Sequence, residues 1–226
     1  AMEPLPLIFC FWHIYLDSHQ NSKPLENAPA FYFMLGSVVL EQVGAGILGF
    51  SMTFSLTNLW SHGTWITPAH GHLALFGTFG MLVIGAAYFA VPALRGIKHF
   101  NQRIGKLAFW LVFIGILGMA VAFAYGGTVQ MYAYRTLGLT WFGGDILPKM
   151  NIYGIFVGLF GILLTFGAVL MTYDLFTMGR QSNLVQVLDD PRAARPTAAS
   201  RWSRPLTGFE AGPWLAIMWL FGAIGS

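Results

Sequence analysis

Charged side chains are scarce in this sequence of 226 residues. Asp, Glu, Lys and Arg together make up 9% of it, whereas hydrophobic residues make up 56%. A soluble domain carries about 25% charged residues. So few charges cannot cover a water-facing surface, so the composition excludes an ordinary soluble domain and indicates a membrane protein. The net charge of +3 does not indicate a nucleic-acid partner, because the basic residues lie in loops between apolar runs.

Cysteine is almost absent. Cys10 is the single cysteine, and it lies in an apolar segment. One cysteine excludes a disulfide framework within the chain, and the absence of a CxxCH motif excludes haem attachment through that motif. Ala1-Met2-Glu3-Pro4 enters an apolar run without a basic region or a cleavage site, so this segment is not expected to be a secretory signal peptide.

Long apolar runs are abundant. Four of them reach the roughly 30 Å of a bilayer's hydrocarbon core at about 1.5 Å per residue. They are Ala30–Leu56, Ala69–Leu94, Leu107–Tyr125 and Ile152–Leu175. Met2–Leu16 is a partial span before them. The predicted fold class is all-α, a polytopic transmembrane helix bundle whose helices contact membrane lipid.

Three regions follow from this pattern. Residues 1–175 are expected to form the transmembrane helices, and residues 176–211, rich in Arg, Pro and Ala, a cytoplasmic linker. Residues 212–226 form an apolar terminal segment shorter than the about 20 residues that a span needs. Because both ends lie in incomplete apolar runs, we expect the chain to be part of a larger protein.

The basic residues predict the orientation. The loop Arg95–Lys106 contains four basic residues and no acidic one, and the tail after Leu175 is also rich in arginine. Both are expected on the cytoplasmic side. Two predicted spans lie between these segments, which returns the chain to the same side of the membrane, so the two assignments agree. The end of the second run that carries His70 and His72 then lies towards the outer face. Residues 126–150 are placed outside and residues 17–29 inside.

His70-Gly71-His72 opens an apolar run with almost no charge. Imidazole is costly to bury in lipid unless something binds it. Two residues apart on an α-helix, the side chains point about 200° away from each other, so they cannot grip one metal from one helical face. They could bind two cofactors, one on each side, and neutral imidazole is a common axial ligand of haem iron. The alternative is a helix start at the membrane interface, where histidine needs no ligand.

Two neighbouring segments carry a family resemblance. Residues 67–77 (TPAHGHLALFG) and 87–96 (AYFAVPALRG) closely resemble the large subunit of bacterial nitric oxide reductase, a branch of the haem-copper oxidase superfamily. Four shorter segments are more weakly similar: Glu3–Pro6, Gly44–Phe50, Ser61–Gly63 and Gly127–Gln130. The resemblance extends from about Met2 to Leu175.

The resemblance implies an enzyme of the bacterial inner membrane that reduces nitric oxide to nitrous oxide. His70 would be the proximal ligand of a catalytic high-spin haem b, and His72 an axial ligand of a low-spin haem b. The family's remaining haem and non-haem iron ligands would lie upstream, since no His-His pair occurs here. The implied partners are the rest of the large subunit and an electron donor: cytochrome c, a cupredoxin or quinol.

Two carboxylates in apolar runs are further candidates. The resemblance implies that Glu3 helps protons or the metal near the binuclear site, while the alternative is an interfacial residue at a helix end. Burial would raise the pKa of Glu3 and let it relay protons at neutral pH. Glu41 has no counterpart in the family pattern. It could conduct protons or bond to a neighbouring helix.

Other polar residues are expected to play no ligand role. His62 is expected at the interface, with a role near haem propionates as the alternative. Arg135 and Lys149 could pair with propionates, but solvent-facing charge is favoured. No ligand role is assigned to His13, His19 or His99.

Three rival functions remain open. An oxygen-reducing oxidase of the C-type branch shares the HxH element. A non-catalytic membrane anchor or quinol-linked cytochrome subunit would bind haem without consuming nitric oxide. A transporter would need polar residues along a path, and the spans offer little beyond Glu3 and Glu41.

Overall fold

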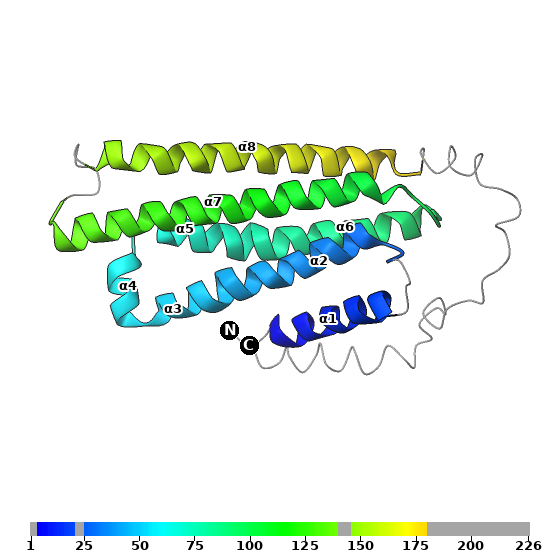
Figure 1. The fold of residues 1–226 in the computed structure, drawn as a ribbon, viewed down its shortest axis with the longest axis horizontal. Coiled ribbons are helices and arrows are strands. Elements are labelled where there is room, and N and C mark those ends of the chain that lie inside the picture. Colours follow the sequence, from blue (N-terminus) through cyan, green and yellow to red (C-terminus); the bar gives the residue numbers. More distant parts are fainter. Residues whose placement is uncertain (1–3, 21–24, 140–145, 180–226) are drawn as a thin grey trace, which may run out of the picture. The chain divides into compact units, whose positions relative to one another are not determined.

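All regular structure described in the computed structural model, which covers residues 4–20, 25–139 and 146–179, is helical. In chain order the helices are α1 (Pro4–Gln20), α2 (Ala28–Glu41), η1 (Gln42–Gly49), α3 (Phe50–Thr53), α4 (Ser55–Ser61), α5 (Ile66–Gly71), η2 (His72–Gly80), α6 (Met81–Leu94), α7 (Gln102–Thr136) and α8 (Leu147–Thr177). The two η segments are π-helical, with a wider turn than an α-helix. The predicted all-α class is confirmed (Figure 1).

The chain divides into two compact units. The first comprises Ala1–Leu184 and contains every helix named above. The second, Val185–Ser226, lies outside the described residues. The predicted apolar segment 212–226 and nearly all of the predicted linker 176–211 therefore lie outside them as well. Of that linker, residues 176 and 177 complete the last turn of α8.

Four helical stretches are long and apolar enough to cross a membrane, as predicted. They are Ala28–Thr53, Ile66–Leu94, Gln102–Thr136 and Leu147–Thr177. The largest difference from the prediction is in the third, because α7 continues past Tyr125 to Thr136 into the segment expected to be an outer loop. Its 35 residues correspond to about 52 Å, so α7 projects beyond the hydrocarbon core.

Local chemistry determines where the first span begins and ends. The side chain of Asn27 accepts a hydrogen bond from the Ala30 N–H at 3.2 Å, and Pro29 lies in the first turn, so α2 begins there. At the other end Phe54 adopts an extended backbone conformation (φ −75°, ψ 129°), which ends α3 at Thr53. The chain then turns through α4 and Gly63 (φ 76°) before α5 begins.

Helices α7 and α8 run side by side in opposite directions along most of their length (Figure 1). Glycines allow this close approach. A Cβ atom on Gly115 would lie 2.8 Å from the Leu164 nitrogen, and one on Gly167 would lie 2.8 Å from a methyl carbon of Val112. The outer face of α8 is exposed along its length, as expected for a helix that contacts lipid.

Replacing Gly115 by valine should separate α7 from α8. The clash is with the Leu164 backbone, which cannot swing aside as a side chain can, and overpacking of this kind costs about 1–3 kcal/mol. We expect a lower midpoint of thermal unfolding in detergent. Gly158→Val on α8 is the matched control, because no atom lies within 4 Å of its added Cβ. Equal midpoints for the two variants would contradict this packing.

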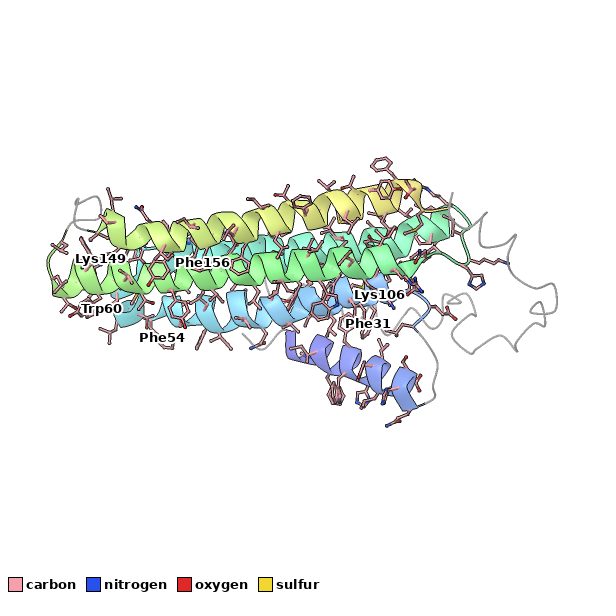
Figure 2. All side chains as sticks on the ribbon, turned by 45° about the horizontal axis from the view of Figure 1, so that its top comes forward. Phe31, Phe54, Trp60, Lys106, Lys149 and Phe156 are labelled. Carbon is pink, nitrogen blue, oxygen red and sulfur yellow. The ribbon has the colours of Figure 1, made fainter. Side chains whose placement is uncertain are left out.

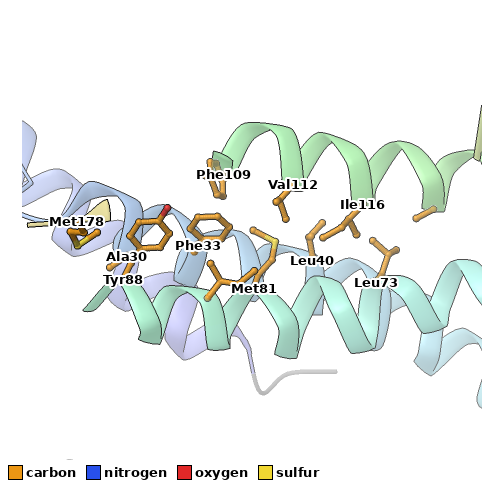
Figure 3. Packing of buried hydrophobic residues seen from close by; sticks show 12 residues of the cluster. Ala30, Phe33, Leu40, Leu73, Met81, Tyr88, Phe109, Val112, Ile116 and Met178 are labelled. Atoms are coloured by element: carbon orange, nitrogen blue, oxygen red, sulfur yellow. The ribbon is translucent and has the colours of Figure 1, made fainter. Parts of the chain in front are cut away.

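The core lies where α2, η2, α6 and α7 meet (Figure 3). Phe33 is fully buried, with its ring stacked on Tyr88 (5.6 Å between centroids) and edge-on to Phe109 (5.4 Å). Leu73, the residue after His72, belongs to the same cluster as Leu40. This core therefore holds the span that carries both histidines against α2 and α7.

Candidate functional site

The span with the two histidines is attached to α7 at its start. The Trp65 N–H donates to Oε1 of Gln130 at 2.7 Å. The glycines of α7 are needed here, because a Cβ on Gly127 would lie within 2.4 Å of the Ile66 nitrogen. This attachment sets the position of α5, whose last turn carries His70. His72 is the first residue of η2.

The His70 imidazole lies against η1. Its Nδ1 is 2.8 Å from the Gly44 carbonyl oxygen, and its Cε1 is 2.8 Å from where a Cβ on Gly49 would stand. Because a carbonyl oxygen only accepts, Nδ1 must carry the proton and donate. The neutral ring then keeps its lone pair on Nε2, which is the atom that a metal binds.

The His72 imidazole lies against a different helix. Its Nδ1 donates to the Pro68 carbonyl oxygen, one turn earlier, at 2.7 Å. Its ring centroid is 5.1 Å from that of Phe123 on α7. Nε2 of His72 therefore also keeps its lone pair. The two imidazoles contact different neighbours, η1 and α7, which agrees with the opposite directions that the spacing predicts.

Both imidazoles are half-buried, and each has one ring nitrogen without a hydrogen-bond partner in the described part of the chain. Among the residues that the structure describes, no three His, Cys, Asp or Glu side chains gather into a group that could hold a metal ion. Each histidine is thus suited to act singly, as an axial ligand of a flat metal complex does, rather than as part of a metal cage built from side chains.

The segments around the histidines are π-helical, which the sequence analysis did not predict. Segments η1 and η2 pack against each other, and the Thr78 hydroxyl donates to the Leu73 carbonyl at 3.2 Å, five residues back. Ser37 donates to the Thr78 carbonyl at 2.8 Å. The available signal was glycine density, since Gly is a poor α-helix former. Short π-helical turns are frequent at functional sites.

The other predicted residues fall in three groups. Glu3 lies outside the described residues. Glu41 is half-buried and is the last residue of α2, directly before η1. The side chains expected to have no ligand role are exposed, namely those of His13, His19, His62, His99 and Lys149.

Arg135 is more buried than a fully solvent-facing charge would be. Its side chain is half-buried, and the guanidinium carbon lies 4.5 Å from the centre of the Tyr134 ring. Its Nε is buried without a hydrogen-bond partner in the described part of the chain. A buried donor without an acceptor is costly. An additional acceptor, most favourably an anion, would complete this environment.

A buried acidic residue in the fourth span also went unpredicted. Asp174 is buried near the end of α8, and the Tyr88 hydroxyl donates to its Oδ2 at 3.0 Å. The Asn27 side chain donates to the Tyr88 carbonyl at 2.8 Å. Asp174 is the single acidic residue in the apolar run Ile152–Leu175, and an acid in such a run indicates a buried polar partner. The hydrogen bond between Tyr88 and Asp174 joins α6 to α8. Tyr88 lies sixteen residues, or ~24 Å, from His72 along the span.

Comparison with known proteins supports the membrane-enzyme interpretation. The family model described as cytochrome c and quinol oxidase polypeptide I matches residues 1–163. A nitric oxide reductase subunit of Stutzerimonas stutzeri is 32% identical over 139 residues, which is 60% of this chain and 29% of that protein.

Two oxidase subunits are similar as well. Cytochrome c oxidase subunit 1 of Thermus thermophilus is 27% identical over 161 residues, covering 70% of this chain and 28% of the relative. The subunit 1 of Corynebacterium glutamicum is 30% identical over 128 residues, covering 54% and 20%. The chain thus spans less than a third of the length of these three relatives. Its long apolar helices and the match over most of its residues assign it to the cytochrome c and quinol oxidase polypeptide I family of multi-pass membrane proteins.

Proposed function

We propose that this chain is a haem-binding part of a nitric oxide reductase large subunit. His70 is the proximal ligand of a high-spin haem b, and His72 is an axial ligand of a low-spin haem b. One observation carries the proposal. Each imidazole donates Nδ1–H to a backbone carbonyl, keeps Nε2 free, and lies against a different helix from the other. The similarity to a nitric oxide reductase subunit favours nitric oxide reduction as the reaction.

The residues present fit haem. Neutral imidazole nitrogen is a suitable axial donor for haem iron. Apart from its chain neighbours and its own helix backbone, no atom lies within 4 Å of a Cβ built on Gly71, so the other helices leave that position open. The unpaired Nε of Arg135 is a suitable donor to a propionate carboxylate. When bound, the haems supply electron transfer and the redox chemistry of the reaction.

The protein's own part is to orient the ligands. The Gly44 carbonyl fixes the tautomer and the ring plane of His70, and the Pro68 carbonyl fixes those of His72. When Nδ1–H donates such a hydrogen bond, Nε2 becomes a more basic metal ligand. Because both rings belong to one helix that is fixed at Trp65 and Leu73, their separation is fixed too. His70 and His72 would thus hold the two haems at fixed positions in the span, and the haems would supply the electron transfer.

Protons are the remaining requirement. Two nitric oxide molecules, two protons and two electrons give one nitrous oxide and one water. Glu3 is the proposed carboxylate that helps deliver protons or supports the non-haem iron, whose ligands lie upstream. Glu41 directly precedes η1, the segment that contacts His70, and is a second carboxylate proposed for this role. A carboxyl group in a membrane span can relay protons by releasing one and then taking up another.

The proposed setting is a bacterial inner membrane. The basic loop Arg95–Lys106 favours the cytoplasm for that end, which places His70 and His72 towards the periplasm. There the chain would join the rest of the large subunit and receive electrons from cytochrome c, a cupredoxin or quinol.

Oxygen reduction is the second candidate. It is favoured by the similarity to two proteins named cytochrome c oxidase subunit 1. The one from Thermus thermophilus aligns with 70% of this chain. Such an enzyme would use the same two histidines.

Metal analysis of the complete haem-loaded protein separates the two reactions. We expect iron without stoichiometric copper, together with anaerobic consumption of nitric oxide and formation of nitrous oxide. Gas-selective electrodes and elemental analysis on the same preparation provide the measurement. Copper at one atom per protein with oxygen consumption would instead establish the oxidase. Haem spectra with neither activity would indicate a non-catalytic cytochrome subunit.

A further inference from the structure

We propose that the loop between α6 and α7, with the first turns of α7, binds the headgroup of an anionic phospholipid. The site consists of Lys98, His99, Arg103 and Lys106, all of which are exposed. This basic site lies far from His70 and His72, at the opposite end of the same span, and takes no part in the proposed reaction.

The loop is held in place rather than free. Ile97 and Phe100 pack against the hydrophobic core, and the Ile97 N–H donates to the Pro92 carbonyl at 2.8 Å. Gly96 adopts a positive φ of 67° that lets the chain turn after α6. Because its two apolar side chains point inward, Lys98 and His99 between them are presented to the outside. A fixed cation loses less conformational freedom when it binds an anion.

The start of α7 adds two cations. Arg103 and Lys106 are three positions apart and therefore lie on one face of the helix. The Asn101 side chain caps this helix by accepting from the Arg103 N–H at 3.0 Å. The positive end of the helix dipole adds to the attraction for a phosphate group.

Acidic side chains are rare around the site. No Asp or Glu occurs between residues 42 and 144 of the sequence. Arg95 is already engaged, since its Nη1 donates to the carbonyls of Leu175 (2.9 Å) and Met178 (3.2 Å), and it is not counted among the free cations. Glu26 is near the start of α7, because its backbone carbonyl accepts a hydrogen bond from the Gln102 side chain at 2.7 Å.

Apolar side chains adjoin the cations on the membrane side. Leu94 is 85% exposed, Leu107 54% and Trp110 52%. Trp110 is exposed about two turns from the start of α7, and tryptophan near a helix end is typical of the membrane–water interface. A phosphate beside the cations with an acyl chain along Leu107 and Trp110 matches a phospholipid better than a free phosphate or a soluble acidic partner. Clustered Lys and Arg at a membrane surface attract anionic lipids.

Native mass spectrometry of the full chain in detergent tests the proposal. The chain is titrated with phosphatidylglycerol and, separately, with phosphatidylcholine of the same acyl chains. We expect tighter binding of phosphatidylglycerol. The variant Lys98→Gln/Arg103→Gln/Lys106→Gln should lose that preference, with a fall in affinity of about fivefold per cation removed. Glu26→Gln should change affinity in the opposite direction, because it removes a neighbouring negative charge.

Three controls make the result decisive. Lys149→Gln removes an exposed cation at the start of α8, far from Lys106 (Figure 2), and should leave the preference unchanged. Lys98→Arg/Lys106→Arg keeps the charges and should retain binding, and circular dichroism should show unchanged helix content for every variant. Glycerol phosphate should not compete at concentrations that match the lipid. The proposal is overturned by equal binding of the two lipids, by retained preference in the triple variant, or by full competition from glycerol phosphate.

Discussion

His72→Ala is expected to abolish the low-spin haem signal of the complete protein, and His70→Ala the high-spin signal. Each substitution removes the nitrogen that would bind one iron, while the other ring keeps its own carbonyl partner. Loss of an outer hydrogen bond alone costs about 10–100-fold in metal affinity, so loss of the ligand itself should exceed that. Optical and paramagnetic resonance spectra of the reduced and oxidised protein measure both signals.

The matched control is His62→Ala, since His62 is an exposed histidine only eight residues from His70 and should leave both spectra unchanged. Extracted haem should fall from two per protein to one in each of the two ligand variants. Spectra unaltered by either ligand substitution would show that the site assignment is wrong. Loss of both signals in both variants, with unchanged helix content, would contradict separate irons for the two rings.

Gly44→Val should selectively weaken the high-spin site. A Cβ on Gly44 would stand 2.2 Å from the Leu73 Cβ and 3.1 Å from the Leu73 carbonyl carbon. The added side chain must therefore push η1 away from η2. That displacement lengthens the hydrogen bond from His70 Nδ1 to the Gly44 carbonyl, which is 2.8 Å in the native structure. We expect about 10–100-fold weaker retention of the high-spin haem.

The low-spin site provides an internal control for this variant. His72 bonds to Pro68 within its own helix, so its signal should survive in Gly44→Val. Gly158→Val, where nothing lies near the added Cβ, should retain both haems. If Gly44→Val kept a native high-spin spectrum and native haem content, the Gly44 carbonyl could not be what orients His70.

The hydrophobic pattern alone was sufficient for the four spans. A bilayer-spanning helix must satisfy its own backbone groups and present apolar side chains along about 20 residues, and both requirements leave a local trace in the sequence. The ends were predicted less well. Phe54 ends the first span by an extended backbone, and α7 runs on to Thr136 because its glycines and Gln130 pack against the start of α5. Those contacts join residues more than sixty positions apart.

The two imidazoles show the same difference between what the local sequence determines and what tertiary packing determines. A separation of two residues on one helix already requires that they face different ways, because helical geometry is local. The neighbours that they face, and therefore their tautomers, depend on packing. His70 meets a carbonyl 26 residues earlier in the chain, on a π-helical segment that no periodicity indicated.

Composition and spacing by themselves determined that this is a polytopic helical membrane protein with two back-to-back imidazoles, since hydropathy and helical period depend only on neighbouring residues. Tertiary structure alone decided that Nδ1 of His70 donates to Gly44, that Nε of Arg135 is buried with no partner among the described residues, and that Asp174 accepts a hydrogen bond from Tyr88. Each of these depends on how distant helices approach one another. Small residues and hydrogen bonds across the interface determine that approach, and neither leaves a periodic signal in the chain.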